Sequence, residues 1–411
     1  MSIIRGFKAY RPAEGLCEKI AALPYDVYDR KEAREKVKGD EFTFLRLDRP
    51  ETQFPEDYDM YAPEVYAKAA ELFHEMTEKG EYIQDIDEKL YIYELCMDGR
   101  YQTGIVAAAS IDDYLNNVIK KHENTRADKE QDRINHVYTM RAQTGPIFLA
   151  YRDRAGINKL VSEVKSETSP VYDFVSDDGI GHRVWVIDDK AVIDSIKKEF
   201  GDTDSIYIAD GHHRAASAVK VGLKMREENP GYTGEEEFNY FLSVLFPESE
   251  LKILPYNRVV KDLNGLTKDE FFDKVKGIAD IIPSDIPVSP QEKGTIGMYI
   301  DNKWYTLKIH DDYKSDDPVK GLDVSILQDY ILGPVLGIDD PRVDKRIAFI
   351  GGIRGLEELE RRCSTDMELA FSMYPTSIDE LFNVADAGLL MPPKSTWFEP
   401  KLRSGIFIHE F

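Results

Sequence analysis

The densest group of chemically active side chains is the run Asp210-Gly211-His212-His213-Arg214, which follows a short apolar stretch. Glycine permits a tight turn, and the residues after it are predicted to begin a helix. A helix N-terminus presents free N–H groups and a partial positive charge, which suit an anion. Arg214 adds a planar guanidinium that can hold a phosphate or a carboxylate through two hydrogen bonds. Asp210 can coordinate Mg²⁺ or accept a proton from a substrate.

Two other interpretations of this run are open. Asp210 can simply cap the helix, with both histidines at the surface of the protein. The histidines can also be ligands of a transition metal, although adjacent histidines rarely bind one ion together and no HxxxH spacing accompanies them. An anion site remains the leading interpretation, and on it we expect Arg214→Ala to remove phosphate affinity with little effect on folding.

A second polar run, His122-Glu123-Asn124-Thr125-Arg126, precedes a predicted helix that contains Arg133. Arg126 and Arg133 can flank a phosphate, with His122 beside them, and Glu123 can act as a general base or a metal ligand. The alternative is a solvated loop followed by the polar face of a helix. The run is therefore a candidate for phosphate or substrate binding.

A third candidate lies near the end of the chain, where Lys394, Ser395, Thr396 and Lys401 concentrate cations and hydroxyls in an otherwise acidic protein. The prolines around them favour a rigid, extended loop. The segment is not a phosphate loop of the GxxxxGK[ST] type, because that spacing is absent. An ordinary loop is the alternative interpretation.

Three weaker signals accompany these runs. Asp26 lies on a predicted turn near the N-terminus, and His182 and Arg183 precede a predicted strand. The glycine-rich stretch 351–355 follows another strand but lacks GxGxxG spacing, so it is a weak candidate for a phosphate-binding loop.

The overall composition restricts the partners of the protein. The 411 residues include 53 basic and 76 acidic side chains, for a net charge of -23. Such a surface repels nucleic acid and anionic membranes, and we expect neither as a partner. The N-terminus lacks the apolar core of a signal peptide, and no apolar run approaches the roughly 20 residues that span a bilayer. We therefore expect a soluble, cytoplasmic protein; the oligomeric state stays open.

Strand and helix patterns alternate around these candidates. Helical periodicity predicts helices over residues 62–79, 213–228 and 268–278. Apolar alternation predicts strands, paired in two places across a short turn; they cover residues 90–95 with 104–109, 147–151, 205–209, 251–256, and 295–300 with 304–309. This alternation favours an α/β protein with a mixed (α+β) sheet.

Two details of the prediction concern the motifs directly. Asp128 and Gln131 form a possible capping box for a helix that continues to about Gln143, where Gly145-Pro146 stops it. The chain is long for a single core, and the pattern of predicted helices, strands and loops changes near residue 264. We expect an α/β core domain over 1–263 and a second α+β domain over 264–411, with 387–411 packing back to complete the site.

These motifs, taken together and in order, resemble the bacterial family known as domain of unknown function 1015. The resemblance covers nearly the whole chain and rests on five elements: Pro24-Tyr25-Asp26-Val27, His122-Glu123-x-Thr125-Arg126 with Asp132-Arg133, His182-Arg183-x-Trp185, Asp210-Gly211-His212-His213-Arg214, and Pro393-Lys394-Ser395-Thr396-x-Phe398-x-Pro400-Lys401. The turn at 210–214 is also distantly similar to that of the ParB/sulfiredoxin superfamily, where a Gly-x-x-Arg turn holds nucleotide phosphates. Some members of that superfamily are free-serine kinases.

The resemblance implies a ParB/sulfiredoxin-like core with large elaborations, and a nucleotide-dependent kinase that acts on a hydroxyl such as that of free serine. ATP or ADP would be the co-substrate, with Mg²⁺ at Asp210. In this hypothesis His212, His213, Arg214 and Gly211 hold phosphate oxygens, and Glu123 or Asp26 is the base. The remaining candidates neutralise charge or bind the substrate; they are His122, Arg126, Arg133, His182, Arg183, Lys394, Ser395, Thr396 and Lys401.

Two other functions are compatible with the same residues. One is the reverse chemistry, a phosphatase or nucleotide hydrolase. The other is a nucleotide-binding switch that turns over slowly. All three predict that the side chains of residues 122–126, 210–214 and 394–401 share one cleft, because they are far apart in sequence and act together only if the fold gathers them.

Overall fold

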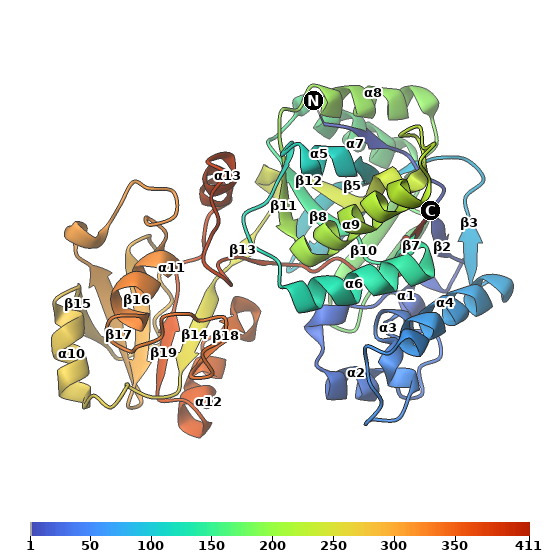
Figure 1. Cartoon of the computed structure of the whole chain (residues 1–411). Coiled ribbons are helices and arrows are strands. Elements are labelled where there is room, and N and C mark those ends of the chain that lie inside the picture. Colours follow the sequence, from blue (N-terminus) through green and yellow to red (C-terminus); the bar gives the residue numbers. More distant parts are fainter. Residues whose placement is uncertain (1) are drawn as a thin grey trace. The chain divides into compact units, whose positions relative to one another are not determined.

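Two sheets organise the chain, and each belongs to a different unit of the computed structural model, which describes residues 2–411 (Figure 1). Unit 1 combines the chain up to Lys120 with Thr125–Leu251 and Pro400–Phe411. Unit 2 combines Lys121–Asn124 with Lys252–Glu399. The chain therefore enters unit 2 briefly at residues 121–124 and returns to unit 1. It forms most of unit 2 at residues 252–399 and ends in unit 1 with residues 400–411.

Unit 1 is built on a nine-stranded sheet of mixed direction. Its strands pair antiparallel except for β11 with β6 and β12 with β8, which are parallel. The order is β6 (Ile119–Lys120), β11 (Ile206–Asp210), β8 (Ile147–Tyr151), β12 (Tyr240–Pro247), β5 (Arg100–Ser110), β4 (Leu90–Met97), β10 (Gly181–Ile187) and β9 (Tyr172–Val175), with β1 (Ile4–Arg5) paired to β5. This mixed sheet confirms the expected fold class.

Helices cover one face of this sheet and form the main core with it. Apolar side chains of every second strand residue meet those of α5 (Ile111–Leu115), α7 (Ala155–Glu167), α8 (Lys190–Gly201) and α9 (His212–Glu228). Small residues at the start of α9, Ala215 and Ala218, let this helix approach the strands closely. The core therefore fixes the N-terminus of α9 at the end of β11, where the Asp210 turn lies.

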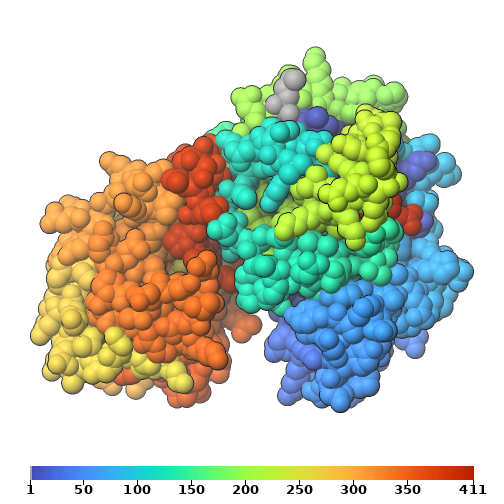
Figure 2. All heavy atoms as spheres, viewed as in Figure 1, coloured from blue at the N-terminus to red at the C-terminus, as the bar shows by residue number. Residues whose placement is uncertain are grey.

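A second core in unit 1 is made by α3 (Leu45–Asp48), α4 (Pro63–Glu78) and α6 (Ala127–Met140). Figure 2 shows α6 in blue-green and α9 in yellow-green as neighbouring parts of the surface of this unit. The end of the chain enters this core through Ile408, and β21 (His409–Glu410) pairs with β7 (Ala142–Gln143). The last residues of the protein are thus an integral part of unit 1.

Unit 2 contains a six-stranded antiparallel sheet. Its order is β15 (Ala279–Ser284), β17 (Lys303–Ile309), β16 (Thr295–Ile300), β19 (Leu369–Ser372), β14 (Tyr256–Val260) and β18 (Ile347–Gly351). The helices of this unit are α10 (Lys268–Lys276), α11 (Asp323–Ile326), the π-helix η6 (Leu327–Leu332), α12 (Glu357–Thr365) and α13 (Ile378–Asp386). A short ribbon, β13 (Ile253–Leu254) with β20 (Trp397–Phe398), holds the segment that follows Lys394.

Most predicted elements are confirmed, and the exceptions have local causes. The helix expected to run to Gln143 ends at Met140, because Arg141 adopts a left-handed conformation (φ 52°) and residues 142–143 pair with the end of the chain. Its capping box is wrong: α6 begins at Ala127, and Asp128 accepts hydrogen bonds from the Arg126 side chain.

Proline explains two further differences in unit 2. The strand predicted over 251–256 is divided at Pro255 into β13 and β14, because proline cannot donate a hydrogen bond to a neighbouring strand. The prolines at 283, 287 and 290 predict a loop, but Pro283 lies within β15, which is an edge strand, where proline is tolerated. Among residues 2–411, no helix is long and apolar enough to cross a membrane.

The packing of α9 gives a first testable prediction. A Cβ atom at Gly222 would lie 2.5 Å from the main-chain oxygen of Phe238 and 2.7 Å from Ile111. Gly222→Ala should therefore lower the free energy of unfolding by roughly 1–3 kcal/mol, although alanine is the better helix former. The control is Gly201→Ala in α8, where nothing lies within 4 Å and stability should stay equal or rise. Urea denaturation of both variants measures this, and equal stabilities would contradict it.

Candidate functional site

A sharp turn between β11 and α9 places Asp210 and Arg214 side by side. Gly211 adopts φ 92°, a left-handed conformation that other residues rarely reach. A side chain at this position would also collide with Arg214, whose guanidinium lies 3.0 Å from the ideal Cβ position. Gly211 is therefore required twice, by its backbone conformation and by the guanidinium packed against it.

Asp210 is held between two cations of unit 1. Lys401 Nζ donates to Asp210 Oδ2 at 3.3 Å, and Arg214 Nη2 lies 3.7 Å from the same oxygen. Burial raises the pKa of this carboxyl group, but Lys401 and Arg214 outweigh burial and lower it well below its usual range. Asp210 is thus an ionised carboxylate at neutral pH and not a proton donor. Lys401, which pairs with it, comes from the last segment of the chain.

Arg214 is largely buried, although the sequence motif predicts a residue that is available to a ligand. Its side chain is only 11% exposed, and Nη1 donates to the main-chain oxygen of Pro146. The expectation that Arg214→Ala would leave folding unaffected is therefore revised, because this substitution removes packing and leaves a carbonyl without its donor. A variant of Lys401 is the cleaner probe of this group.

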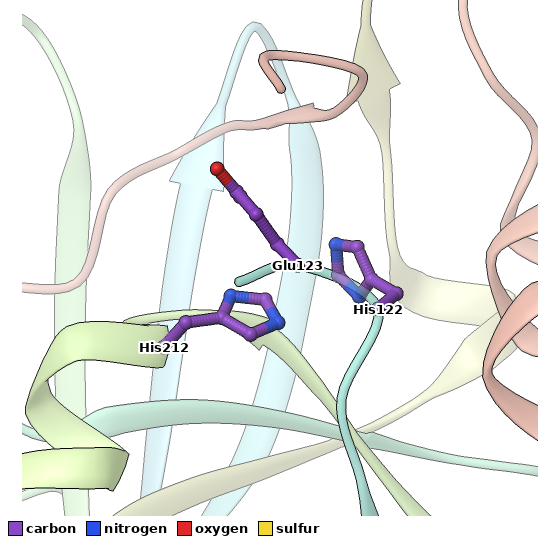
Figure 3. Close-up of side chains that lie close together, drawn as sticks. All are labelled: His122, Glu123 and His212. Atoms are coloured by element: carbon purple, nitrogen blue, oxygen red, sulfur yellow. The ribbon is translucent and has the colours of Figure 1, made fainter. Parts of the chain in front are cut away.

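The two histidines of the turn have distinct positions. His212 is the first residue of α9 and is buried (Figure 3). His213 Nε2 accepts a hydrogen bond of 3.0 Å from the main-chain N–H of Arg126. A nitrogen that accepts cannot carry a proton, so His213 is a neutral imidazole in this arrangement. The Arg126 side chain itself is exposed and paired with Asp128, so only its main chain joins the group.

Arg133 lies inside unit 1. It is paired with Asp132 through Nε and Nη2 at 3.0 and 2.9 Å, and its guanidinium lies 4.1 Å from the centre of the Tyr25 ring. Asp26, the next residue, is exposed on the short 3-10 helix η1 (Tyr25–Val27). The N-terminal motif and Arg133 are therefore neighbours, as a shared site requires.

Unit 1 contains a pocket of about 430 Å³, part of it open to solvent. Arg214 and Arg133 line it together with Tyr25, so the pocket adjoins the Asp210 group. The remaining lining residues are Asp48, His136, Val137, Gln143, Thr144, Gly145, Ile147, Ala218 and Ser404. No sequence motif indicates Asp48, His136, Thr144 or Ser404, because each occurs singly among ordinary residues. Only the pocket that they line together identifies them.

Other predicted residues belong to unit 2. His122 and Glu123 lie on a loop between β6 and α6 (Figure 3). The main-chain oxygen of His122 accepts a hydrogen bond from Met391 at 2.8 Å, and its Nε2 lies 3.5 Å from the Thr396 hydroxyl. Two of the sequence motifs, far apart along the chain, thus meet within this unit.

Lys394 is presented by an unusual main chain. Its φ of 60° is uncommon for a residue with a side chain. Arg258, which is 3% exposed, donates to the Lys394 main-chain oxygen at 3.1 Å and to that of Tyr256. Burial lowers the pKa of Arg258 to about 10. Ser395 donates to the Pro392 oxygen at 2.6 Å, so this hydroxyl shapes the loop and is bound within it.

His182 and Arg183 lie on β10 of unit 1. His182 is fully buried, with Nδ1 2.8 Å from the Tyr93 hydroxyl and Nε2 3.0 Å from the Ser176 hydroxyl. Arg183 points the other way on β10 and pairs with Asp173 and Glu94. We leave both residues out of the site that we propose below.

The structure thus assembles two groups of predicted residues. In unit 1 it gathers Asp210, Gly211, Arg214 and Lys401, with His213 and the main chain of Arg126. In unit 2 it brings His122 and Thr396 together, and Lys394 precedes Thr396 by two residues. The common cleft of residues 122–126, 210–214 and 394–401 stays a prediction.

Comparison with known proteins identifies the family. The model described as "Protein of unknown function (DUF1015)" matches residues 4–325, and the chain belongs to this family. No curated protein matches the chain. Among solved structures, a free serine kinase variant in complex with ADP is similar at 14% identity and a TM-score of 0.35, covering 72% of this chain and 87% of that one.

Two further solved structures are similar. SbnI with a C-terminal truncation, from Staphylococcus aureus, has 10% identity and a TM-score of 0.40, covering 72% of this chain and 82% of its own. A conserved hypothetical protein from Pyrococcus furiosus has 14% identity and a TM-score of 0.34, covering 73% and 93%.

The burial of His182 gives a prediction about acid stability. Burial lowers its pKa to about 3, against about 6.5 in an unfolded chain. Between these values the unfolded state binds more protons, so stability is present above pH 6.5 and is lost as the pH falls toward 3, by up to about 1.4 kcal/mol per pH unit. His182→Gln should flatten this slope by up to one proton.

Denaturant unfolding at a series of pH values measures the slope. The matched control is His74→Gln, because the His74 side chain is 73% exposed and its loss should leave the slope unchanged. Identical slopes for wild type and His182→Gln would contradict the neutral, buried state of His182.

Proposed function

We propose that this member of the DUF1015 family is a small-molecule phosphotransferase, which uses ATP or ADP to phosphorylate a hydroxyl such as that of free serine. One observation carries the proposal: Asp210 is held by Lys401 and Arg214 at the N-terminus of a 17-residue helix. Two cations against one carboxylate leave a surplus positive charge, and the helix N-terminus adds to it.

Phosphoryl transfer depends mainly on stabilising charge on the transferred group and on positioning. Lys401 and Arg214 would neutralise phosphate oxygens, and the first N–H groups of α9 would donate to them. Gly211 leaves room for the Arg214 guanidinium to pack against the turn, which keeps this cation beside the helix N-terminus. His213, as a neutral imidazole whose Nε2 accepts from Arg126, carries its proton on Nδ1 and would act as a hydrogen-bond donor without contributing a charge.

The residues present fit a magnesium ion. Both printed ion pairs of Asp210 involve Oδ2, so its carboxylate would be the protein group that holds the ion. Mg²⁺ typically takes one or two carboxylates, waters and substrate phosphates. When bound, it would supply further neutralisation of the charge on the transferred phosphoryl group.

Two carboxylates are candidates for orienting the acceptor hydroxyl and taking its proton. Asp26 is exposed and adjoins Tyr25, which lines the pocket beside Arg214. Glu123 lies on the loop of residues 121–124 in unit 2. Of the two, only Asp26 belongs to the same unit as Arg214 and Lys401.

The same charges would serve hydrolysis, so a phosphatase or nucleotide hydrolase is the second candidate function. A nucleotide-binding switch is the alternative of another class; it would bind nucleotide with slow turnover and a change in oligomeric state. Incubation with ATP or ADP, Mg²⁺ and L-serine, followed by detection of phosphoserine and free phosphate, separates these functions. Phosphoserine formation supports the kinase, release of phosphate from ATP or phosphoserine alone supports hydrolysis, and binding without either product supports the switch.

The proposed role of Lys401 is directly testable. Lys401→Met should weaken binding of ADP by roughly 10- to 100-fold, because it removes one charged hydrogen bond to phosphate. Isothermal titration calorimetry measures the affinity. Lys197→Met, which removes an exposed cation of α8, is the matched control and should bind ADP as the wild type does.

Folding is checked by the melting temperature, since Lys401→Met also removes an ion pair with Asp210. A folded Lys401→Met variant with unchanged ADP affinity would overturn the proposed phosphate site. So would a wild-type protein that binds neither ADP nor ATP in the presence of Mg²⁺.

A further inference from the structure

Asp48 is the most under-satisfied carboxylate in the pocket of unit 1. It is 2% exposed, at the end of α3, and it lines the pocket. Its side chain accepts one hydrogen bond, from the Thr144 hydroxyl at 2.8 Å, and within residues 2–411 it forms no ion pair. A buried carboxylate is costly unless it is paired. Arg133 and His136 are close enough to interact with Asp48 electrostatically, but neither forms an ion pair with it, so the carboxylate can take a cationic partner from a ligand.

Positive charges outnumber negative charges among the arginines of the pocket and in the Asp210 group beside it. Arg214 and Lys401 together face the single carboxylate of Asp210. Arg133 directs Nε and Nη2 to Asp132, and its Nη1 forms no hydrogen bond within residues 2–411. The pocket therefore offers guanidinium donors toward one part of a ligand and a carboxylate without a direct ion pair toward another.

The remaining polar groups of the pocket are neutral. His136 Nε2 donates to the Leu47 oxygen at 2.8 Å, and burial together with Arg133 lowers the pKa of the imidazole. Gln143 is fully engaged, since its amide bonds to the main chain of Tyr240 and Leu242. Neither residue can supply the cation that Asp48 lacks.

We infer that this pocket binds the phosphate acceptor as a small zwitterion, with its ammonium group on Asp48 and its carboxylate toward Arg133 and Arg214. That this zwitterion is the phosphate acceptor rests on the proposed function. Asp48 would select against hydroxy acids, which lack the ammonium group, and the two arginines would select against amines, which lack the carboxylate. The pocket is partly open to solvent, so a small ligand can reach these side chains from outside.

The first experiment needs no substitution and no nucleotide. Calorimetry with the full-length protein compares L-serine with L-alanine, D-glycerate and ethanolamine. L-serine and L-alanine should bind, because both carry the two charges. D-glycerate lacks the ammonium group and ethanolamine lacks the carboxylate, so each should bind at least roughly 30-fold more weakly. Equal binding of D-glycerate and L-serine, or no binding of any amino acid, would overturn the inference.

The second experiment assigns the ammonium site. Asp48→Asn keeps an oxygen for the Thr144 hydroxyl but removes the charge, so it should weaken L-serine binding by at least roughly 30-fold. ADP affinity should stay within about twofold, because Asp48 does not contact the Asp210 group. Asp57→Asn, an exposed change of the same charge, is the control.

The two proposals fail in different ways. Loss of L-serine binding in Asp48→Asn supports the pocket assignment even if wild type binds no nucleotide. Unchanged L-serine binding in a folded Asp48→Asn variant overturns the assignment while leaving nucleotide binding untouched. If calorimetry with MgCl₂ or CaCl₂ alone shows a cation site that Asp48→Asn removes, the missing partner is a metal ion and the zwitterion inference is overturned.

Discussion

The ion pair between Lys401 and Asp210 joins residues that are almost two hundred positions apart, and the candidate site depends on it. Asp210 ends β11, while Lys401 comes from the last segment of the chain, which returns to unit 1 at Pro400. The pairing keeps a carboxylate ionised beside a helix N-terminus, where alone it would weaken an anion site. With Lys401 and Arg214 present, the same turn carries a net positive charge inside a protein of net charge -23.

The last segment can supply Lys401 because several contacts tie it to unit 1. Ala22 and Ser404 exchange main-chain hydrogen bonds, Tyr10 and Ile408 form a second bridge, and β21 pairs with β7. Ser404 also lines the pocket, next to the main chain of Gly145. The segment that completes the charge balance at Asp210 therefore also forms part of the wall around Asp48.

Sequence patterns predicted the strand–turn–helix at 205–228 because apolar periodicity, glycine and small helical residues all act locally there. They failed where distant pairing decides the structure, as at 142–143, which pair with the end of the chain. Contiguity in sequence was also misleading, since His122 and Arg126 belong to different units. Asp48 was missed because its significance lies in the partner it lacks, which no spacing rule reveals.

Asp48 and Asp210 show how one unit can use two buried or half-buried carboxylates in opposite ways. Two cations, Lys401 and Arg214, pair with the single negative charge of Asp210. Among residues 2–411, no cation lies within ion-pair distance of Asp48. Arg214 contributes to both surroundings, because it contacts Asp210 and lines the pocket with Asp48. Electrostatic recognition of a polyanion and of a zwitterion requires this separation of charge, since a pocket of uniformly positive potential would repel the ammonium group of an amino acid.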